Sequence, residues 1–301
     1  MEVKIKILIS IFFTITVSIG CSDKRDDIKN EFNTGLLGGN WKTENLSDGL
    51  WENSLWLSFE DSTCSYLLPN SAKSNYRIDG HDLILDSTLD HPELRFEILS
   101  LDKANLTLVP KGELKKELIG FFEKYKQPEL LKRIGGREPS KIDTLFFKRV
   151  QKKNELSFTS ISLFTGACNG GECKPFILEI KKDRTVHLFD LEQHKGYRGE
   201  VSGCIMERLN SLVQNIPINK LKNRYEAPWT DDQEISLKIE SAGKTINTVV
   251  YGFFNEPIEL RALMEELESI KFLKNLRESD DIKRENFVFD QIPANVEESM
   301  N

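Results

Sequence analysis

Two cysteines near the middle of this 301-residue sequence are its best candidates for chemistry. Cys168 and Cys173 enclose the segment Asn-Gly-Gly-Glu, and residues typical of a strand follow from Pro175. A redox pair usually has C-x-x-C spacing and opens a helix, whereas zinc sites combine closely spaced cysteine and histidine ligands. Here the cysteine spacing is longer, and His187 and His194 do not form a short pair. We therefore predict a disulfide worth about 2 kcal/mol through loop closure, with redox and metal roles open as less favoured alternatives.

The other cysteines give weaker signals. Cys64 and Cys204 fall in different predicted domains, and each is more simply interpreted as a buried apolar thiol. Because four cysteines allow three pairings, the sequence alone does not fix the connectivity.

A group of carboxylates is the second candidate for chemistry. Glu226, Asp231 and Asp232 surround Pro228 and Trp229, and they could form an acid/base pair or a cation site. A solvated turn is the commoner explanation for such a loop. The sequence contains no P-loop, no nucleophile elbow and no H-E-x-x-H motif. We expect no metal and no cofactor, and we favour binding over catalysis.

The first twenty residues have the layout of a secretory signal peptide. Lys4 and Lys6 precede an apolar run that is too short to span a bilayer, and small residues lead up to Cys21. This ending resembles the lipobox of bacterial lipoproteins, although Ser18 stands where that family usually has an aliphatic residue. The resemblance implies acylation of Cys21 and a lipid anchor in the bacterial cell envelope, with the protein expected to be an outer membrane lipoprotein that faces the periplasm or the cell surface. The alternative is ordinary cleavage that leaves Cys21 as a free thiol.

Residues 21–33 are charged and poor in apolar side chains, which is typical of a solvated tether. The formal net charge of the chain is -7, and this acidic balance argues against nucleic acid as a partner. The expected partners are the membrane, through the lipid, and a small apolar ligand or another envelope protein.

Residues 34–151 contain short alternating segments that predict an antiparallel β-meander. A helical pattern over 112–127 interrupts the meander before its last strand. Gly39-Asn40-Trp41 and the later Arg149 resemble the G-x-W motif and closing-strand arginine of lipocalin-like β-barrels. The resemblance implies that Arg149 covers Trp41 at the closed end, and that the interior is either a ligand cavity or filled with side chains. Trp56 is open to both uses, as a pocket wall or as core.

Residues 152–275 predict an α+β domain in which two apolar-striped helices cover one face of a sheet. This region resembles an uncharacterised family of secreted bacterial domains with a C-x-G-x-C-P core, matched here by Cys168, Gly170, Cys173 and Pro175. The extra residue between the cysteines and the inserted Lys174 depart from that core. Residues 276–301 are interpreted as a tail.

These observations predict an α+β protein made of a lipocalin-like barrel and a smaller sheet-and-helix domain. The expected function is non-catalytic binding by an envelope lipoprotein. Two alternatives stay open: an envelope enzyme with a site at the domain interface near the loop from Glu226 to Asp232, and a purely structural partner of another envelope protein.

Overall fold

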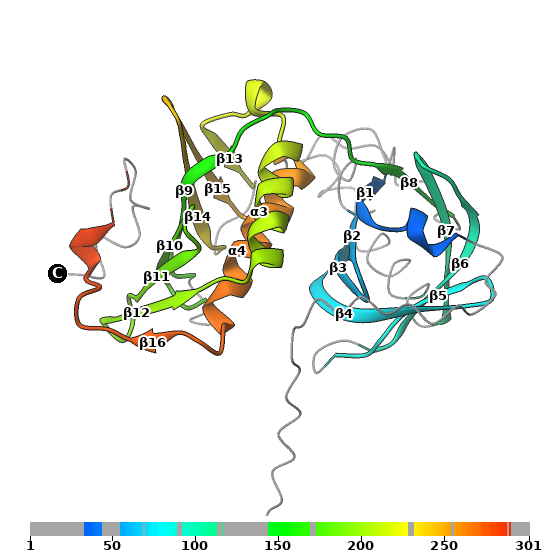
Figure 1. The fold of residues 1–301 in the computed structure, drawn as a ribbon, viewed down its shortest axis with the longest axis horizontal. Helices are drawn as coiled ribbons and strands as arrows, with labels where there is room; N and C mark the ends of the chain where they lie inside the picture. Colours follow the sequence, from blue (N-terminus) through cyan, green and yellow to red (C-terminus); the bar gives the residue numbers. More distant parts are fainter. Residues whose placement is uncertain are drawn as a thin grey trace, which may run out of the picture.

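A computed structural model describes residues 33–43, 55–68, 70–88, 92–112, 116, 144–168, 173–227, 232–253, 256–287 and 289. The predictions for the leader, Cys21 and Asp231 lie outside these residues, as does most of the predicted helix over 112–127. Within the described part, a closed barrel and an open sheet lie on either side of two helices (Figure 1). No described helix is both long enough and apolar enough to cross a membrane.

The barrel contains eight antiparallel strands in sequence order, and it closes because β1 pairs with β8 as well as with β2. A short 3-10 helix, η1 (Thr34–Leu36), precedes it. The strands are β1 (Gly39–Thr43), β2 (Trp56–Glu60), β3 (Thr63–Leu68), β4 (Asn70–Asp79), β5 (Asp82–Leu85), β6 (Leu94–Leu101), β7 (Asn105–Lys111) and β8 (Leu145–Arg149).

Alternation along each strand separates the inside of the barrel from its outside. On β2, Leu57 and Phe59 point inward, while Trp56 and Ser58 point outward. The interior is a packed core of large side chains: Leu37, Trp41, Leu55, Leu57, Phe59, Cys64, Tyr66, Leu83, Leu85, Leu94, Phe96, Ile98, Leu106, Leu108, Leu145 and Phe147. Of the two alternatives for the interior, a ligand cavity or a filling of side chains, this core fits the second.

The second sheet has the order β13-β15-β14-β9-β10-β11-β12-β16. Its neighbours are antiparallel except for β13 and β15, which run parallel. The strands are β9 (Phe158–Thr165), β10 (Phe176–Lys181), β11 (Thr185–Asp190), β12 (Lys195–Glu200), β13 (Arg224–Glu226), β14 (Glu234–Ser241), β15 (Lys244–Tyr251) and β16 (Arg277–Glu278).

Helices α3 (Gly203–Asn215) and α4 (Ile258–Ser269) form a layer between the sheet and the barrel (Figure 1). Ser202 caps α3 by accepting a hydrogen bond from the Ile205 backbone N–H at 3.3 Å. Short 3-10 turns follow the helices or lie near the end of the chain: η2 (Ile218–Lys220), η3 (Ile270–Phe272) and η4 (Arg284–Asn286).

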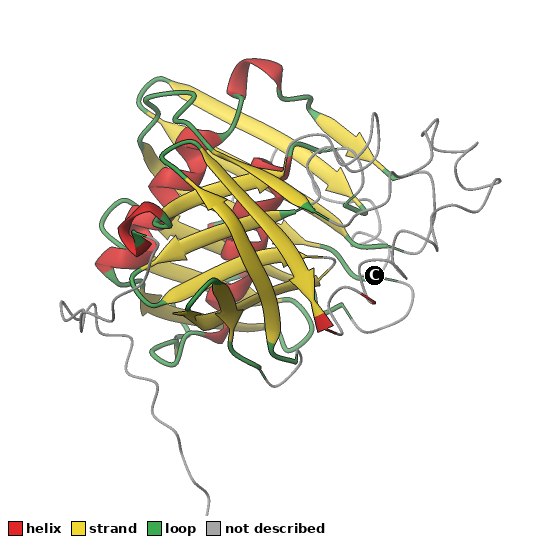
Figure 2. Cartoon of the chain, turned by 90° about the vertical axis from the view of Figure 1, so that its right-hand side faces the viewer, coloured by secondary structure: helices red, strands yellow, loops and turns green. Residues whose placement is uncertain are grey.

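Both helices bury two faces. The apolar stripe of each packs on the sheet, with Leu209 and Val213 on α3 and Leu263 and Leu267 on α4 among the most buried residues. Their opposite faces meet the outer surface of the barrel, whose strands cross in front in Figure 2. Trp56 and Leu67 from the barrel accordingly belong to the same apolar cluster as the helices.

The interpretation of everything after residue 275 as a tail is wrong for its first part. Residues 277–278 form β16, which pairs with β12, and Ile282 is buried. Gly196 on β12 permits this contact, because a Cβ atom there would lie 1.9 Å from the carbonyl oxygen of Ile282. Beyond it, Phe287 and Phe289 pack on the sheet face that points away from the helices, beside Phe164.

Candidate ligand site between the barrel and the helices

The predicted barrel-closing pair is a structural feature at one end of the barrel. The Arg149 guanidinium lies 4.2 Å from the ring centroid of the fully buried Trp41, in a cation–π contact. Arg149 also donates hydrogen bonds to the backbone carbonyls of Leu36, Gly38 and Lys103. With this many interactions inside the fold, Arg149 holds η1 and β1 in place.

The cysteines are arranged only partly as expected. The disulfide between Cys168 and Cys173 is confirmed, with Cα atoms 5.4 Å apart. Cys64 is a free, fully buried thiol inside the barrel, and burial raises its pKa. The prediction for Cys204 is wrong, because this residue is disulfide-bonded. It lies in the first turn of α3, where it is partly exposed instead of being enclosed in the core.

The carboxylate loop does not provide a recognisable reactive group within the described residues. The side chain of Glu226 is exposed, and it accepts a hydrogen bond from Arg224 at 2.5 Å. Arg224 also binds Glu234 at 2.6 Å, and Asp232 accepts a hydrogen bond from the backbone N–H of Gln233 at 2.7 Å. Within the part of the chain that the structure describes, no three histidine, cysteine or acidic residues are grouped as metal ligands.

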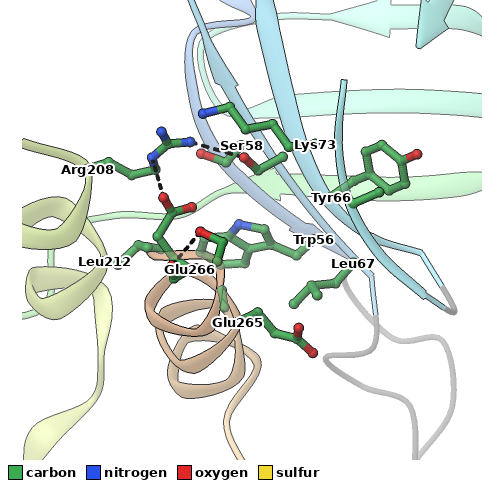
Figure 3. A pocket seen from close by; sticks show the side chains of 13 residues that line it. Trp56, Ser58, Tyr66, Leu67, Lys73, Arg208, Leu212, Glu265 and Glu266 are labelled. Carbon is green, nitrogen blue, oxygen red and sulfur yellow. Dashed lines mark hydrogen bonds and ion pairs between the residues drawn. The ribbon is translucent and has the colours of Figure 1, made fainter. Parts of the chain in front are cut away.

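A pocket of about 200 Å³ lies where the outer face of the barrel meets the two helices (Figure 3). We call this contact region the seam; it consists of the outward side chains of β2, β3 and β4 and the facing side chains of α3 and α4. The pocket is lined by Trp56, Ser58, Ser65, Tyr66, Leu67, Ala72, Lys73, Arg208, Leu212, Ala262, Glu265, Glu266 and Ser269.

Strand register brings the barrel side of the pocket together. Ser58 on β2 pairs with Ser65 on β3, and Ser65 pairs with Lys73 on β4, so the three side chains form a row on the outer face. Trp56 and Leu67 form the next row toward the apolar end of the pocket. The barrel wall is thus polar at one end and apolar at the other.

The helical side of the pocket carries a buried arginine. Arg208 on α3 is only 5% exposed, and its Nε atom lies 3.2 Å from Oε1 of Glu266 on α4. Its guanidinium also lies 3.3 Å from Oε2 of Glu60 and donates a 3.1 Å hydrogen bond to Ser65 Oγ. Burial raises the pKa of Glu60, and the Arg208 charge opposes that rise. Arg208 therefore connects both helices to the barrel wall.

Three polar groups that line the pocket have no partner within the described part of the chain. Among the described residues, the indole N–H of Trp56, the hydroxyl of Ser58 and the ammonium of Lys73 make no hydrogen bond or ion pair. Trp56 and Ser58 are 2% and 5% exposed, so little bulk water reaches them. Partial desolvation, followed by the nearby Arg208 charge, lowers the pKa of Lys73. Polar groups of nearly buried residues such as Trp56 and Ser58 are usually satisfied, whereas Lys73 is an exposed residue. The convergence of the three groups on one cavity is informative.

A second charged contact joins the domains beside the pocket. Glu259, in the first turn of α4, is 1% exposed, and its Oε1 atom lies 3.1 Å from Lys42 Nζ and 2.6 Å from Lys153 Nζ. Burial alone would raise the pKa of Glu259, but the two lysines hold it below its ordinary value. Lys42 comes from β1 and Lys153 from the connection to β9, so Glu259 links three parts of the chain.

Sequence reasoning did not identify Arg208 or Lys73 as site residues. Arg208 had a detectable signal, because an arginine interrupts the apolar side of a helix between Ile205 and Leu212. Lys73 had none, since a lysine on an alternating strand usually faces solvent. Trp56, which was open to both uses, forms part of the helix-facing core and also lines the pocket.

Comparison with known proteins gives a family for one part of the chain. No curated protein and no solved structure matches the sequence. A family model does match the part of the chain from β9 to η3. This part contains the second sheet up to β15 together with both helices, and the barrel lies outside it. Residues 159–271 match a family described as a domain of unknown function, DUF6438.

Proposed function

We propose that this protein is a non-catalytic binding protein whose ligand is a small molecule held in the seam pocket. The observation that carries the proposal is the convergence of Trp56, Ser58 and Lys73, three polar groups with no partner among the described residues, on one cavity. Binding sites commonly combine an apolar wall with a few polar groups that fix orientation. Here Leu67 and Leu212 supply the apolar wall.

The size of the pocket limits the ligand. A cavity of about 200 Å³ has the volume of about seven water molecules, at roughly 30 Å³ each in the liquid. It is smaller than the roughly 300–1,000 Å³ typical of drug-sized ligands. The proposed ligand is therefore a compact molecule of metabolite size.

The barrel is proposed to act as a rigid wall for this site rather than as a container. Sixteen buried side chains form its interior cluster. The seam pocket lies on its outer face. A lipocalin-like identity for the barrel is also a proposal, and it is supported by the contact between Arg149 and Trp41.

We also propose that the protein is an envelope lipoprotein anchored through Cys21. The support is the leader sequence, in which basic residues, a short apolar run and small residues precede the cysteine. Mass spectrometry of the mature N-terminal peptide tests this. The expected result is a chain that begins with an acylated Cys21. An intact leader or an unmodified Cys21 would contradict the anchor. Acylation would occupy the Cys21 sulfur, so the anchor also requires that Cys204, which is disulfide-bonded, has no bond to Cys21 in the mature chain. A Cys21 held in a disulfide would contradict the anchor as well.

A fragment screen by saturation-transfer NMR tests the binding proposal. The library should contain small acids, amides and amines, and hits are compared between the wild-type chain and two variants that fill the pocket from opposite walls. Ala262→Phe fills it from α4, and Ser58→Leu fills it from β2. Thr245→Leu, at an exposed position on β15, is the matched strand control.

Hits that are lost in both filled variants and kept in Thr245→Leu would support the proposal. Melting temperatures show that each variant is folded before binding is compared. A screen without hits, or hits that survive in both filled variants, would refute the seam pocket as a binding site.

A further inference from the structure

We infer that the ligand of the seam pocket carries a carboxylate, which accepts hydrogen bonds from the Trp56 indole, the Ser58 hydroxyl and the Lys73 ammonium. The inference rests on the proposed binding function and assigns the chemical class of its ligand. It follows from the one pocket-lining ammonium that makes no ion pair with the described residues, from the kind of hydrogen-bonding group left over, and from the position of these groups relative to the apolar wall.

The ion pairs around the pocket point to the sign of the ligand. Four charged residues line the pocket: Lys73, Arg208, Glu265 and Glu266. Arg208 is bound by Glu266 at 3.2 Å, with Glu60 adding a second carboxylate at 3.3 Å. Glu265 lies 3.6 Å from Nε of Arg261, which precedes it by one helical turn. Within the described residues, Lys73 is thus the one pocket-lining charge that makes no ion pair, and Glu60 and Glu266 act on it only from a longer distance. An anionic group on the ligand would give Lys73 a direct partner.

The remaining hydrogen-bonding groups agree with that sign. The Trp56 indole N–H and the Lys73 ammonium can only donate hydrogen bonds, and the Ser58 hydroxyl can donate one. A ligand that accepts hydrogen bonds satisfies all three at once, whereas an amine would compete with Lys73 and leave the indole N–H unpaired. Leaving a nearly buried donor unpaired costs about 1–3 kcal/mol. A carboxylate has enough acceptor positions for three donors.

Strand geometry places the three donors on one surface. Trp56 and Ser58 are two residues apart on β2, so both project outward toward the helices. Lys73 reaches the same region from β4, two strands away in the row that contains Ser58 and Ser65. Figure 3 shows the Lys73 side chain running past Ser58 toward Arg208.

The apolar end of the pocket defines the rest of the ligand. Leu67, Leu212 and Ala262 line it opposite the polar row, and the Trp56 ring forms part of the same wall. A short aliphatic or aromatic carboxylate would place its charged group near Lys73 and its hydrocarbon part against these side chains. Benzoate, with a ring and a single carboxylate, is a suitable probe for a cavity of about 200 Å³.

Isothermal titration of three ring-bearing probes of similar size tests the inference on the full chain. Benzoate, benzamide and benzylamine share a ring and differ in the charge of the polar group. We expect benzoate to bind about tenfold more tightly than benzamide or better, because a charge-assisted hydrogen bond is worth more than a neutral one. We expect benzylamine to bind more weakly than benzamide.

Variants assign the effect to the named groups. Lys73→Met should weaken benzoate binding about tenfold or more and leave benzamide binding unchanged. Trp56→Phe should weaken both probes, since both carry an acceptor oxygen. Lys103→Met, at an exposed lysine in the turn before β7, is the control and should match wild type. Melting temperatures confirm that each variant is folded.

The outcomes separate this inference from the proposed function. Benzamide or benzylamine binding at least as tightly as benzoate, with loss of binding in the pocket-filled variant Ala262→Phe, would overturn the carboxylate and keep the site. Equal loss of benzoate binding in Lys73→Met and Lys103→Met would also overturn it. Failure of all three probes to bind, combined with an empty fragment screen, would overturn both proposals.

Discussion

The Nζ atom of Lys42, on the first strand of the barrel, lies 3.1 Å from Oε1 of Glu259, at the start of α4. Lys153, in the connection between the domains, reaches the same oxygen at 2.6 Å. Glu259 is 1% exposed, so water stabilises its negative charge very little. The two lysines stabilise that charge instead. This contact fixes the barrel against the helices and so preserves the seam in which the pocket lies.

Glu259→Gln should lower the free energy of unfolding by about 1–3 kcal/mol. Removing one partner of a buried ion pair costs about 3–5 kcal/mol when the other is fully buried, but Lys42 and Lys153 are 26% and 33% exposed and can regain water. Urea unfolding followed by circular dichroism measures the change. Glu155→Gln is the matched control, since Glu155 is 84% exposed and pairs with Lys152 at the surface. An effect of Glu259→Gln no larger than that of the control would refute the linking role of Glu259.

Glu268 on α4 should make stability depend on pH near neutrality. Burial, aided by the neighbouring Glu265 charge and opposed by Lys271, raises the pKa of Glu268 from 4.5 to about 7. As pH rises above 4.5, the carboxyl ionises in the unfolded chain first, so the folded state loses stability until pH passes about 7. Glu268→Gln removes this loss. It should raise the melting temperature relative to wild type at pH 8, with little difference at pH 4.

The control for that measurement is Glu207→Gln, at an exposed position on α3. Differential scanning calorimetry at both pH values compares the two variants with wild type. A Glu268→Gln shift of equal size at pH 4 and pH 8 would contradict the raised pKa of Glu268.

The barrel end should be sensitive to both members of its closing pair. Trp41→Ala should cost about 3–5 kcal/mol, because it leaves a cavity where a fully buried indole was. Arg149→Met should cost about 1–3 kcal/mol, since the carbonyls of Leu36, Gly38 and Lys103 lose their donor. Guanidinium unfolding monitored by circular dichroism measures both. Unchanged midpoints would contradict this account of the barrel end.

Cysteine chemistry should distinguish the three described environments. Iodoacetamide should not modify Cys64 in the folded protein, because the thiol is fully buried and its pKa is raised. Cys168 and Cys173 should resist alkylation until a reductant is added, and Cys204 should behave likewise. Peptide mapping by mass spectrometry, with and without urea, reads out each site. Alkylation of Cys168 or Cys173 in native, unreduced protein would refute the disulfide.

Local patterns in the sequence predicted local features of the fold. Alternation of apolar and polar residues identified most strands, and the short spacing of Cys168 and Cys173 identified their disulfide. Gly196 and Gly199 lie within β12, where no local pattern explains them. Glycine is a weak strand former, but both positions require it because other parts of the chain come too close for a side chain. Ile282 lies against Gly196, and Leu276 lies against Gly199.

The seam could not be predicted because its contacts join distant segments. Arg208 binds Glu60, and Asn40 on β1 donates a hydrogen bond to Ser211 on α3 at 3.3 Å. No local sequence pattern in α3 or in the barrel strands indicates which distant segment each of them contacts. Outward polar positions on β2 and β4 look solvent-exposed when each strand is considered alone. Only the docking of α3 and α4 turns Ser58 into a buried residue that faces a pocket.

A crystal structure of the protein soaked with benzoate, or with the strongest hit of the fragment screen, tests the central claim most directly. The predicted result is ligand density in the seam pocket, with an acceptor oxygen within about 3.2 Å of Lys73 Nζ or Trp56 Nε1 and the apolar part against Leu212. Ligand density inside the barrel, or binding in solution with an empty seam pocket in the crystal, would contradict it.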